Sequence, residues 1–303
     1  MKKSLICVAL ILLVVSAALS QKRAKPKPAQ AKLIVFAVIS DGERIEPIGE
    51  IDKGKLIETI GGDGEEKSLL SFSQNYYKPK TNYNLIFGGA KNGTVTIVSS
   101  NPKSTCGKNA ATVTTQSTKA KLKGLVMGLA TNETLIKAVS GLRRLPTATE
   151  RAEIESLVRA EFLKQSVAAS AVKNLKYLNL TALDVDNDKR AEMVGTFWVE
   201  TAPTTRALLF FIADKGANGK YAFGYSEFKT VKQEELMSGS EIKMIDDGIY
   251  HERLLDALEY DGDNSAEIFT YTESFEGSSF YAYSRRDGKW VKAFEGSNYH
   301  CAF

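Results

Sequence analysis

The chain has 303 residues, of which 40 are lysine or arginine and 36 are aspartate or glutamate, so its formal net charge is +4. So small a basic excess gives no argument for a nucleic-acid partner, because such proteins concentrate lysine and arginine against the phosphates. The length suffices for one large or two ordinary domains with a hydrophobic core.

Residues 1–20 have the layout of a secretory signal peptide. Two lysines precede an apolar run over 5–19, and the small residues Ala18 and Ser20 stand at the −3 and −1 positions of a cut before Gln21. The run is about 15 residues long, shorter than the roughly 20 that a membrane-spanning helix requires. We therefore predict an exported protein, periplasmic or extracellular, with no membrane span after cleavage. An uncleaved N-terminal anchor is the alternative.

The segment after the expected cut changes character twice. Residues 21–32 interleave lysine and arginine with proline and predict a solvated basic linker. Residues 33–145 carry short β-branched runs separated by glycine-rich or Asn-Gly turns, which predict a small N-terminal β domain of sandwich or barrel type. The expected strands are 33–39, 45–51, 55–60, 83–87 and 94–99.

The second expected domain, 146–303, begins with a helix. Thr147 and Glu150 have the spacing of a capping box, in which each side chain satisfies a backbone N–H of the first helical turn. Ile154, Val158 and Phe162 then recur at helical spacing with charged residues between them. We predict one amphipathic helix lying on a sheet.

Two sets of strands follow the helix, with cores at 176–228 and 253–295. The expected strands are 176–183, 192–200, 206–213 and 220–228 in the first set, and 253–258, 266–273, 278–285 and 289–295 in the second. An offset of 75 residues aligns 182–193 with 257–268, because each begins with Ala-Leu and ends with Ala-Glu and an apolar residue. This match predicts a duplicated unit of about four strands, so the expected fold is mainly β.

Each copy contains an acidic loop, which we call loop 1 (184–192) and loop 2 (259–267). Calcium prefers roughly six to eight oxygen ligands, and a tight loop directs alternate residues toward one centre. The expected ligands in loop 1 are the side chains of Asp184, Asp186, Asp188 and Glu192 and the backbone carbonyl of Arg190. In loop 2 they are the side chains of Glu259, Asp261, Asp263 and Glu267 and the carbonyl of Ser265. We predict up to two calcium ions; empty, solvated acidic turns are the alternative.

The acidic loops and the strands around them resemble the calcium-loop repeats of the FG-GAP and VCBS families. Those repeats, found in integrin-α-like β-propellers and in exported bacterial proteins, carry D-x-D-x-D-G-x-x-D/E between the first two strands of a four-stranded blade. The resemblance covers 176–295 and implies two blade-like units with the ligand roles just given. The glycine usual at the sixth position is Lys189 in loop 1 and Asn264 in loop 2, and Glu259 replaces the usual first aspartate. Two copies cannot close a propeller, which typically needs four or more blades.

Two cysteines remain after the expected cleavage, Cys106 and Cys301. An even number in an oxidising compartment favours a disulfide between them. Two free thiols or an intermolecular bridge are the alternatives.

Catalytic motifs are not evident. The G-x-S-x-G pattern of a serine nucleophile is absent from the sequence, and in the glycine-rich segment 61–68 Glu66 stands where a phosphate-binding loop needs glycine. We therefore predict a non-catalytic binding or interaction protein with two calcium-stabilised loops and an unknown protein or glycan ligand. The alternatives are a carboxylate-dependent carbohydrate-active hydrolase, and a structural envelope protein in which calcium serves stability alone.

Overall fold

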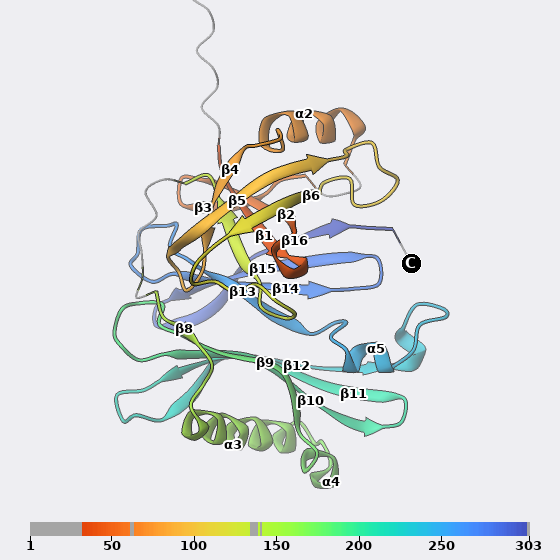
Figure 1. Cartoon of the computed structure of the whole chain (residues 1–303). Helices are drawn as coiled ribbons and strands as arrows, with labels where there is room; N and C mark the ends of the chain where they lie inside the picture. The colour runs from red at the N-terminus through yellow and green to blue at the C-terminus, as the bar shows by residue number, and fades with distance from the viewer. Residues whose placement is uncertain (1–31, 61–63, 134–138, 140, 302–303) are drawn as a thin grey trace, which may run out of the picture. The chain divides into compact units, whose positions relative to one another are not determined.

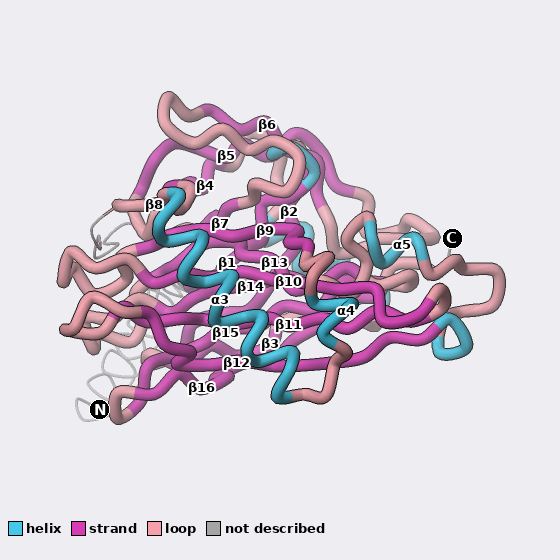
Figure 2. Tube along the Cα trace, turned by 90° about the horizontal axis from the view of Figure 1, so that it is seen from below, coloured by secondary structure: helices cyan, strands magenta, loops and turns pink. Residues whose placement is uncertain are grey.

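Strands dominate the chain, as predicted, and they are arranged in stacked layers (Figures 1 and 2). The computed structural model describes residues 32–60, 64–133, 139 and 141–301. The expected signal peptide and all but the last residue of the expected linker lie outside these residues. Among the described helices, none is both long enough and apolar enough to cross a bilayer.

Residues 33–131 build a closed six-stranded barrel. The strands follow one another around the barrel in the order β1-β7-β4-β5-β6-β2, β2 pairs again with β1, and β3 extends the sheet beyond β2. The strands are β1 (Leu33–Ile39), β2 (Arg44–Asp52), β3 (Lys55–Glu58), β4 (Asn82–Ile86), β5 (Lys91–Ser100), β6 (Ala111–Gln116) and β7 (Gly128–Thr131). Closure leaves no unpaired edge among the six ring strands.

The strand β1 is apolar throughout because both of its faces are covered. Phe36 and the residues two positions to either side point into the barrel, where Tyr77 and Tyr83 meet the Phe36 ring at centroid distances of 5.7 and 4.9 Å. Val35 and Ala37 face the other way and belong to the core shared with the last sheet. A strand buried on both faces reads as a continuous hydrophobic run rather than as an alternating pattern.

The helix α2 (Glu66–Tyr76) was not predicted from the sequence. Phe72 and Tyr76 of this helix are buried in the barrel core, and Leu69 is buried as well. The segment contains several serines, which are indifferent helix formers, so packing against the barrel accounts for the helix.

Two antiparallel meanders follow the barrel. We call them sheet B, with strand order β12-β11-β10-β9-β8, and sheet C, with order β13-β14-β15-β16. Sheet B consists of β8 (Arg143–Arg144), β9 (Lys176–Leu183), β10 (Glu192–Ala202), β11 (Thr205–Lys215) and β12 (Tyr221–Lys232). Sheet C consists of β13 (Glu252–Leu258), β14 (Glu267–Glu273), β15 (Gly277–Arg286) and β16 (Lys289–Tyr299). Each predicted set of four strands is therefore present, joined in sequence order.

The helix α3 (Ala148–Lys164) covers the outer face of sheet B. Its capping box is confirmed: Glu150 N donates to Thr147 Oγ1 at 3.2 Å, and Thr147 N donates to a Glu150 carboxylate oxygen at 2.8 Å. Ile154, Val158 and Phe162 are fully buried against β9–β12, as their spacing predicted. The remaining short helical segments are η1 (Ser40–Gly42), α4 (Ala169–Val172), η2 (Gln233–Glu235) and α5 (Lys243–Asp246).

Sheet C lies between sheet B and the barrel (Figure 1). Phe210 of sheet B meets Tyr283 of sheet C at 5.5 Å in one core, and Phe280 of sheet C packs with barrel residues in the next. Asp256 of β13, which is fully buried, joins all three layers. Its carboxylate accepts from Gly89 N of the barrel at 2.7 Å and from Arg143 Nη1 of β8 at 2.6 Å.

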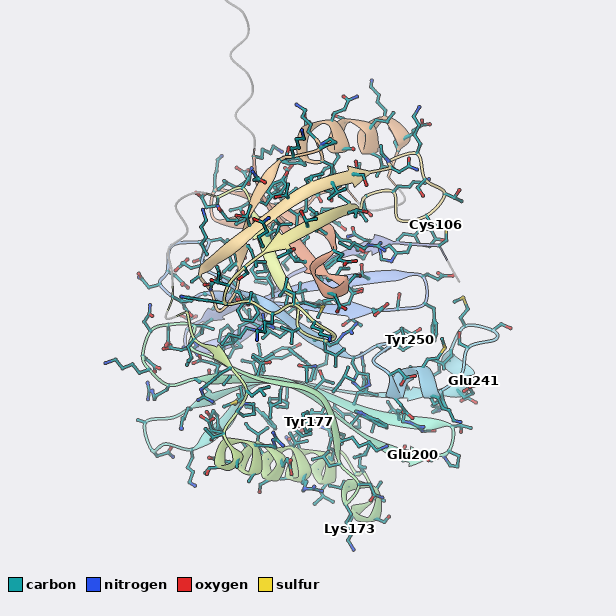
Figure 3. All side chains as sticks on the ribbon, in the orientation of Figure 1. Cys106, Lys173, Tyr177, Glu200, Glu241 and Tyr250 are labelled. Carbon is teal, nitrogen blue, oxygen red and sulfur yellow. A yellow bond between two sulfur atoms is a disulfide. The ribbon has the colours of Figure 1, made fainter. Side chains whose placement is uncertain are left out.

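A disulfide joins Cys106 of the barrel to Cys301, just beyond β16, with their Cα atoms 5.1 Å apart. This is the pairing that the sequence favoured; Cys106 is labelled in Figure 3. The crosslink spans 195 residues of sequence and ties the last strand to the barrel. A loop of that length gives a disulfide a large effect on the unfolded chain in the entropic model.

Candidate metal sites in two equivalent loops

Loop 1 and loop 2 have the same backbone conformation. Each connects the first two strands of its four-strand meander, loop 1 between β9 and β10 and loop 2 between β13 and β14. Asn187 and Lys189 have φ angles of 61° and 68°, and Gly262 and Asn264, 75 positions later, have φ angles of 91° and 74°. Because positive φ is uncommon for residues other than glycine and asparagine, a match at two positions indicates that the duplication extends to the loop backbone.

The same hydrogen bonds recur in both loops. They run from backbone N–H groups to the carboxylates at the first, third and fifth loop positions. In loop 1 the bonds are Asp188 N to Asp186 (3.2 Å), Arg190 N to Asp188 (2.7 Å) and Lys189 N to Asp184 (3.3 Å). In loop 2 the equivalent bonds, in the same order, are Asp263 N to Asp261 (3.1 Å), Ser265 N to Asp263 (2.7 Å) and Asn264 N to Glu259 (2.6 Å). These bonds keep the acidic side chains turned toward the loop backbone.

Carboxylate oxygens converge in each loop. In loop 1 the converging residues are Asp184, Asp186 and Asp188, and in loop 2 they are Glu259, Asp261 and Glu267; within each group one oxygen per residue lies within 4.8 Å of the others. Two oxygens on opposite sides of a calcium ion are about 5 Å apart, since each Ca–O distance is about 2.3–2.6 Å. Both groups can therefore hold a metal ion, as the spacing predicted. The groups omit Glu192 and Asp263, two of the expected ligands.

Glu267 is the least water-accessible of the four loop 2 acids. Its side chain is 1 % accessible, and neither carboxylate oxygen accepts a hydrogen bond from any residue that the structure describes. Burial is the main cause that raises its pKa to about 9, followed by the negative charge of Asp261, with Glu259 and Asp263 adding to the effect. A buried carboxylate without a donor is costly. A divalent cation at this position would satisfy both oxygens at once, so the loop 2 residues fit such an ion.

Loop 1 differs because an arginine from sheet C enters it. Arg285 of β15 donates from Nη1 to Asp186 at 2.6 Å and from Nη2 to Glu192 at 3.2 Å. The other Glu192 oxygen accepts from Val185 N at 3.1 Å. Burial raises the pKa of Glu192 to about 7, and Arg285 and the Val185 bond oppose that rise. The loop 1 acids thus have protein donors that the loop 2 acid Glu267 lacks.

Arg285 is itself held in place on the side away from loop 1. Its Nη2 also donates to Asp214 of β11 at 2.6 Å, and its guanidinium lies 4.8 Å from the centre of the Trp290 ring. Trp290 Nε1 donates to the same Asp214 oxygen at 2.9 Å. The guanidinium is therefore fixed by three acids and one ring. At the exposed end of loop 1, Arg190 Nε pairs with Asp188 at 2.6 Å.

The two loops touch each other and loop 2 also touches the barrel. Ala266 N of loop 2 donates to Val185 O of loop 1 at 2.8 Å, and both residues are fully buried. Gly54, in the β2–β3 turn of the barrel, lies so close to Asp261 that a Cβ on the glycine would be 3.4 Å from the Asp261 Cα. Loop 2 therefore lies where the barrel, sheet B and sheet C meet.

Another pair of carboxyls lies between sheets B and C. Glu252 accepts from Thr270 at 2.5 Å and from Tyr283 at 2.8 Å, and burial raises its pKa to about 7. Glu227 lines the same cavity, and hydrogen bonds from Tyr225 and Lys292 lower its pKa against the effect of burial. The cavity measures about 10 Å³, which is about the room that one water molecule needs. A sugar ring does not fit there.

Aromatic residues of the last unit are mostly interior. A carbohydrate-active protein would present such rings on an open face, and the candidates in sheet C and next to it are Tyr271, Phe275, Phe280, Tyr281, Tyr283 and Trp290. All except Tyr281 are buried. Tyr271 and Phe280 belong to the core between sheet C and the barrel, and Tyr283 and Trp290 belong to the core between sheets B and C.

No family model matches the chain, and neither curated proteins nor solved structures show a significant similarity to it. The fold and the two loops define a mainly β protein with paired acidic loops that can hold metal ions. The resemblance to FG-GAP and VCBS repeats stays an expectation. Arg285 is the one important site residue that sequence reasoning missed, because nothing in the local sequence links it to an acidic loop 93 residues earlier.

Proposed function

We propose that this chain is an exported, non-catalytic binding or interaction protein in which loop 2 binds one calcium ion as part of its folded structure. The observation that carries the proposal is the Glu267 carboxylate. It is buried, has no hydrogen-bond donor among the described residues, and lies beside Glu259 and Asp261. An apolar or neutral side chain would suit such a position better unless a cation binds there.

Calcium fits this position better than magnesium does. The loop offers several carboxylates and a backbone carbonyl, which suits the roughly six to eight oxygen ligands of calcium, whereas magnesium demands near-ideal octahedral geometry and keeps several waters. Glu259, Asp261 and Glu267 would hold the ion, with Asp263 and the Ser265 carbonyl as the further ligands expected from the spacing. The ion would supply positive charge at a place where no described cationic side chain pairs with a loop 2 carboxylate.

The position of loop 2 favours a structural role for the ion. Through Ala266 the loop bonds to loop 1 of sheet B, and through Asp261 it contacts Gly54 of the barrel. An ion that orders loop 2 would therefore brace the junction of three layers. A rigid junction suits a binding protein that presents one surface to an external protein or glycan.

Export is the second part of the proposal. The layout of residues 1–20 supports it, and the Cys106–Cys301 disulfide is compatible with an oxidising compartment. Expression of the full chain with its natural N-terminus tests this part. We expect the exported protein to begin at Gln21 by intact-mass measurement, and recovery of the uncut chain from the cytoplasm would refute it.

Calcium titration of the metal-free protein by calorimetry tests the metal site. We expect saturable binding that Glu267→Gln abolishes, since the substitution removes one charge and leaves the side-chain size unchanged. Glu295→Gln is the matched control, because Glu295 is exposed on β16 of the same sheet and lies outside both loops. Binding that survives Glu267→Gln unchanged, or that is absent from the wild-type chain, would refute the loop 2 site.

A further inference from the structure

We propose that Arg285 occupies the cation position of loop 1, so that the chain has one exchangeable divalent-cation site, in loop 2, and one loop neutralised permanently by a guanidinium. The inference builds on the proposed calcium site in loop 2. It corrects the expectation of two equivalent ions, and it names the residue that decides which loop takes a metal.

The contacts of Arg285 in loop 1 fall on two of the expected metal ligands, Asp186 of the converging group and Glu192 outside it. Its two terminal nitrogens bond to Asp186 and Glu192, the third and ninth loop positions, at 2.6 and 3.2 Å. A metal bridging these two carboxylates would need the place that the guanidinium holds. Arginine suits this role, because its planar group bonds two carboxylates at once and stays charged at any accessible pH.

The register of the two sheets explains where Arg285 comes from. Ile268 follows loop 2 and pairs with Tyr283, as Met193 follows loop 1 and pairs with Ala213. Two positions further along the partner strand stand Arg285 in sheet C and, equivalently, Lys215 in sheet B.

Lys215 and Arg285 share their surroundings as well as their register. Each is paired across the hairpin with an aromatic residue, Tyr221 or Trp290, and each places its cation over that ring, at 5.3 and 4.8 Å from the centre. A basic residue at this position is therefore a feature of the repeat. In sheet C it reaches across to the loop of the neighbouring repeat.

Loop 2 has no third repeat beside it. The next layer is the barrel, whose β2–β3 turn presents Gly54 to Asp261. No described basic side chain takes the place at Glu267 that Arg285 takes at Glu192. The stacking order of the layers thus leaves loop 2 as the loop whose charge a dissolved cation must balance.

Calcium titrations of four proteins test the inference: the wild type, Glu267→Gln, Arg285→Met and the double variant. We expect one ion for the wild type, none for Glu267→Gln, two for Arg285→Met and one, in loop 1, for the double variant. Arg286→Met is the matched control, because Arg286 is the exposed neighbour on the same strand, and it should bind one ion. A folded double variant that binds no calcium would overturn the inference.

Arg285 also bonds to Asp214 and packs on Trp290, so its replacement changes more than loop 1. Asp186→Asn provides a test that keeps the arginine. If Arg285 fills loop 1, this variant binds one calcium ion as the wild type does. A wild type that binds two ions, one of which Asp186→Asn removes, refutes the inference. The double variant also separates the two proposals. If the wild type binds no calcium but the double variant binds one ion, the proposed loop 2 site is refuted and the role of Arg285 in loop 1 stands.

Discussion

Loop 1 and loop 2 share their length, their left-handed residues and their backbone hydrogen bonds, yet their charges are balanced differently. In loop 1 the guanidinium of Arg285 lies between Asp186 and Glu192. In loop 2 the corresponding glutamate, Glu267, is buried among other acids with no described donor. On the assignment proposed above, one duplicated loop sequence forms an ion site in one copy and an internal ion pair in the other.

The difference teaches that an acidic motif is completed by the layer packed against it. The acids of loop 1 face a second copy of the repeat, which supplies a basic residue at a fixed register position. The acids of loop 2 face a barrel that is unrelated to the repeat and supplies a glycine turn instead. On the proposed assignment, whether a loop binds metal depends on its neighbour as much as on its own residues.

The largest effect should come from Arg285→Met in the presence of a chelator. Removing one partner of a largely buried ion pair leaves the other charges uncompensated, and here Asp186, Glu192 and Asp214 would all lose a donor. We expect a loss of roughly 2–4 kcal/mol in the free energy of unfolding, measured by urea denaturation. Calcium should restore part of it, whereas Arg286→Met should stay within about 0.5 kcal/mol of the wild type. A loss no larger than that of the control would show that Arg285 is not the group that neutralises loop 1.

Calcium itself should stabilise the protein through loop 2 alone. At a free concentration about 100 times the dissociation constant, an ion bound only by the folded state adds about 2.7 kcal/mol. We expect thermal unfolding to shift upward by several degrees in the wild type and in Glu295→Gln, and not to shift in Glu267→Gln. An equal shift in Glu267→Gln would place the ion elsewhere and remove the contrast between the loops.

In the metal-free protein, Glu192 and Glu267 should change the free energy of unfolding over different pH ranges. A carboxyl whose pKa is raised by folding contributes fully to stability only below its pKa in the unfolded chain, which is near 4.5. That contribution is lost as the pH rises to its pKa in the folded protein. That loss is complete near pH 7 for Glu192 and continues to about pH 9 for Glu267. Between pH 7 and 9 the wild type in chelator should therefore lose about 1.4 kcal/mol per pH unit relative to Glu267→Gln. Parallel stability curves over this range would contradict the buried state of Glu267.

Much of the fold follows from local patterns in the sequence. The strand 33–39 coincides with a β-branched apolar run that ends at a turn, the strand 176–183 ends where the first acidic residue of loop 1 stands, and Thr147 and Glu150 mark the start of α3. The alternating acids located both loops, because ligand spacing is a local property. These features need no knowledge of the rest of the chain.

Features that depend on packing between distant segments were not predictable in the same way. The helix α2 is stabilised by the barrel that it covers, and the ring closes only because β1 meets both β2 and β7. Arg285 looks like an ordinary basic residue at the end of a strand. Its role follows from the stacking of sheet C on sheet B, which no single repeat specifies.

The smallest difference between the loops lies in their sixth residue. Lys189 and Asn264 both adopt left-handed backbone angles, which disfavour a lysine by about 1 kcal/mol and an asparagine much less. Glycine relieves this strain but increases the entropy of the unfolded chain by a comparable amount. In chelator we therefore expect Lys189→Gly to stabilise the protein by about 0.5 kcal/mol at most, and Asn264→Gly to be neutral or slightly destabilising, by urea denaturation. If Asn264→Gly stabilised the protein more than Lys189→Gly, the backbones of the two loops would differ in solution. The two loops could then no longer be compared as the same backbone with different cations.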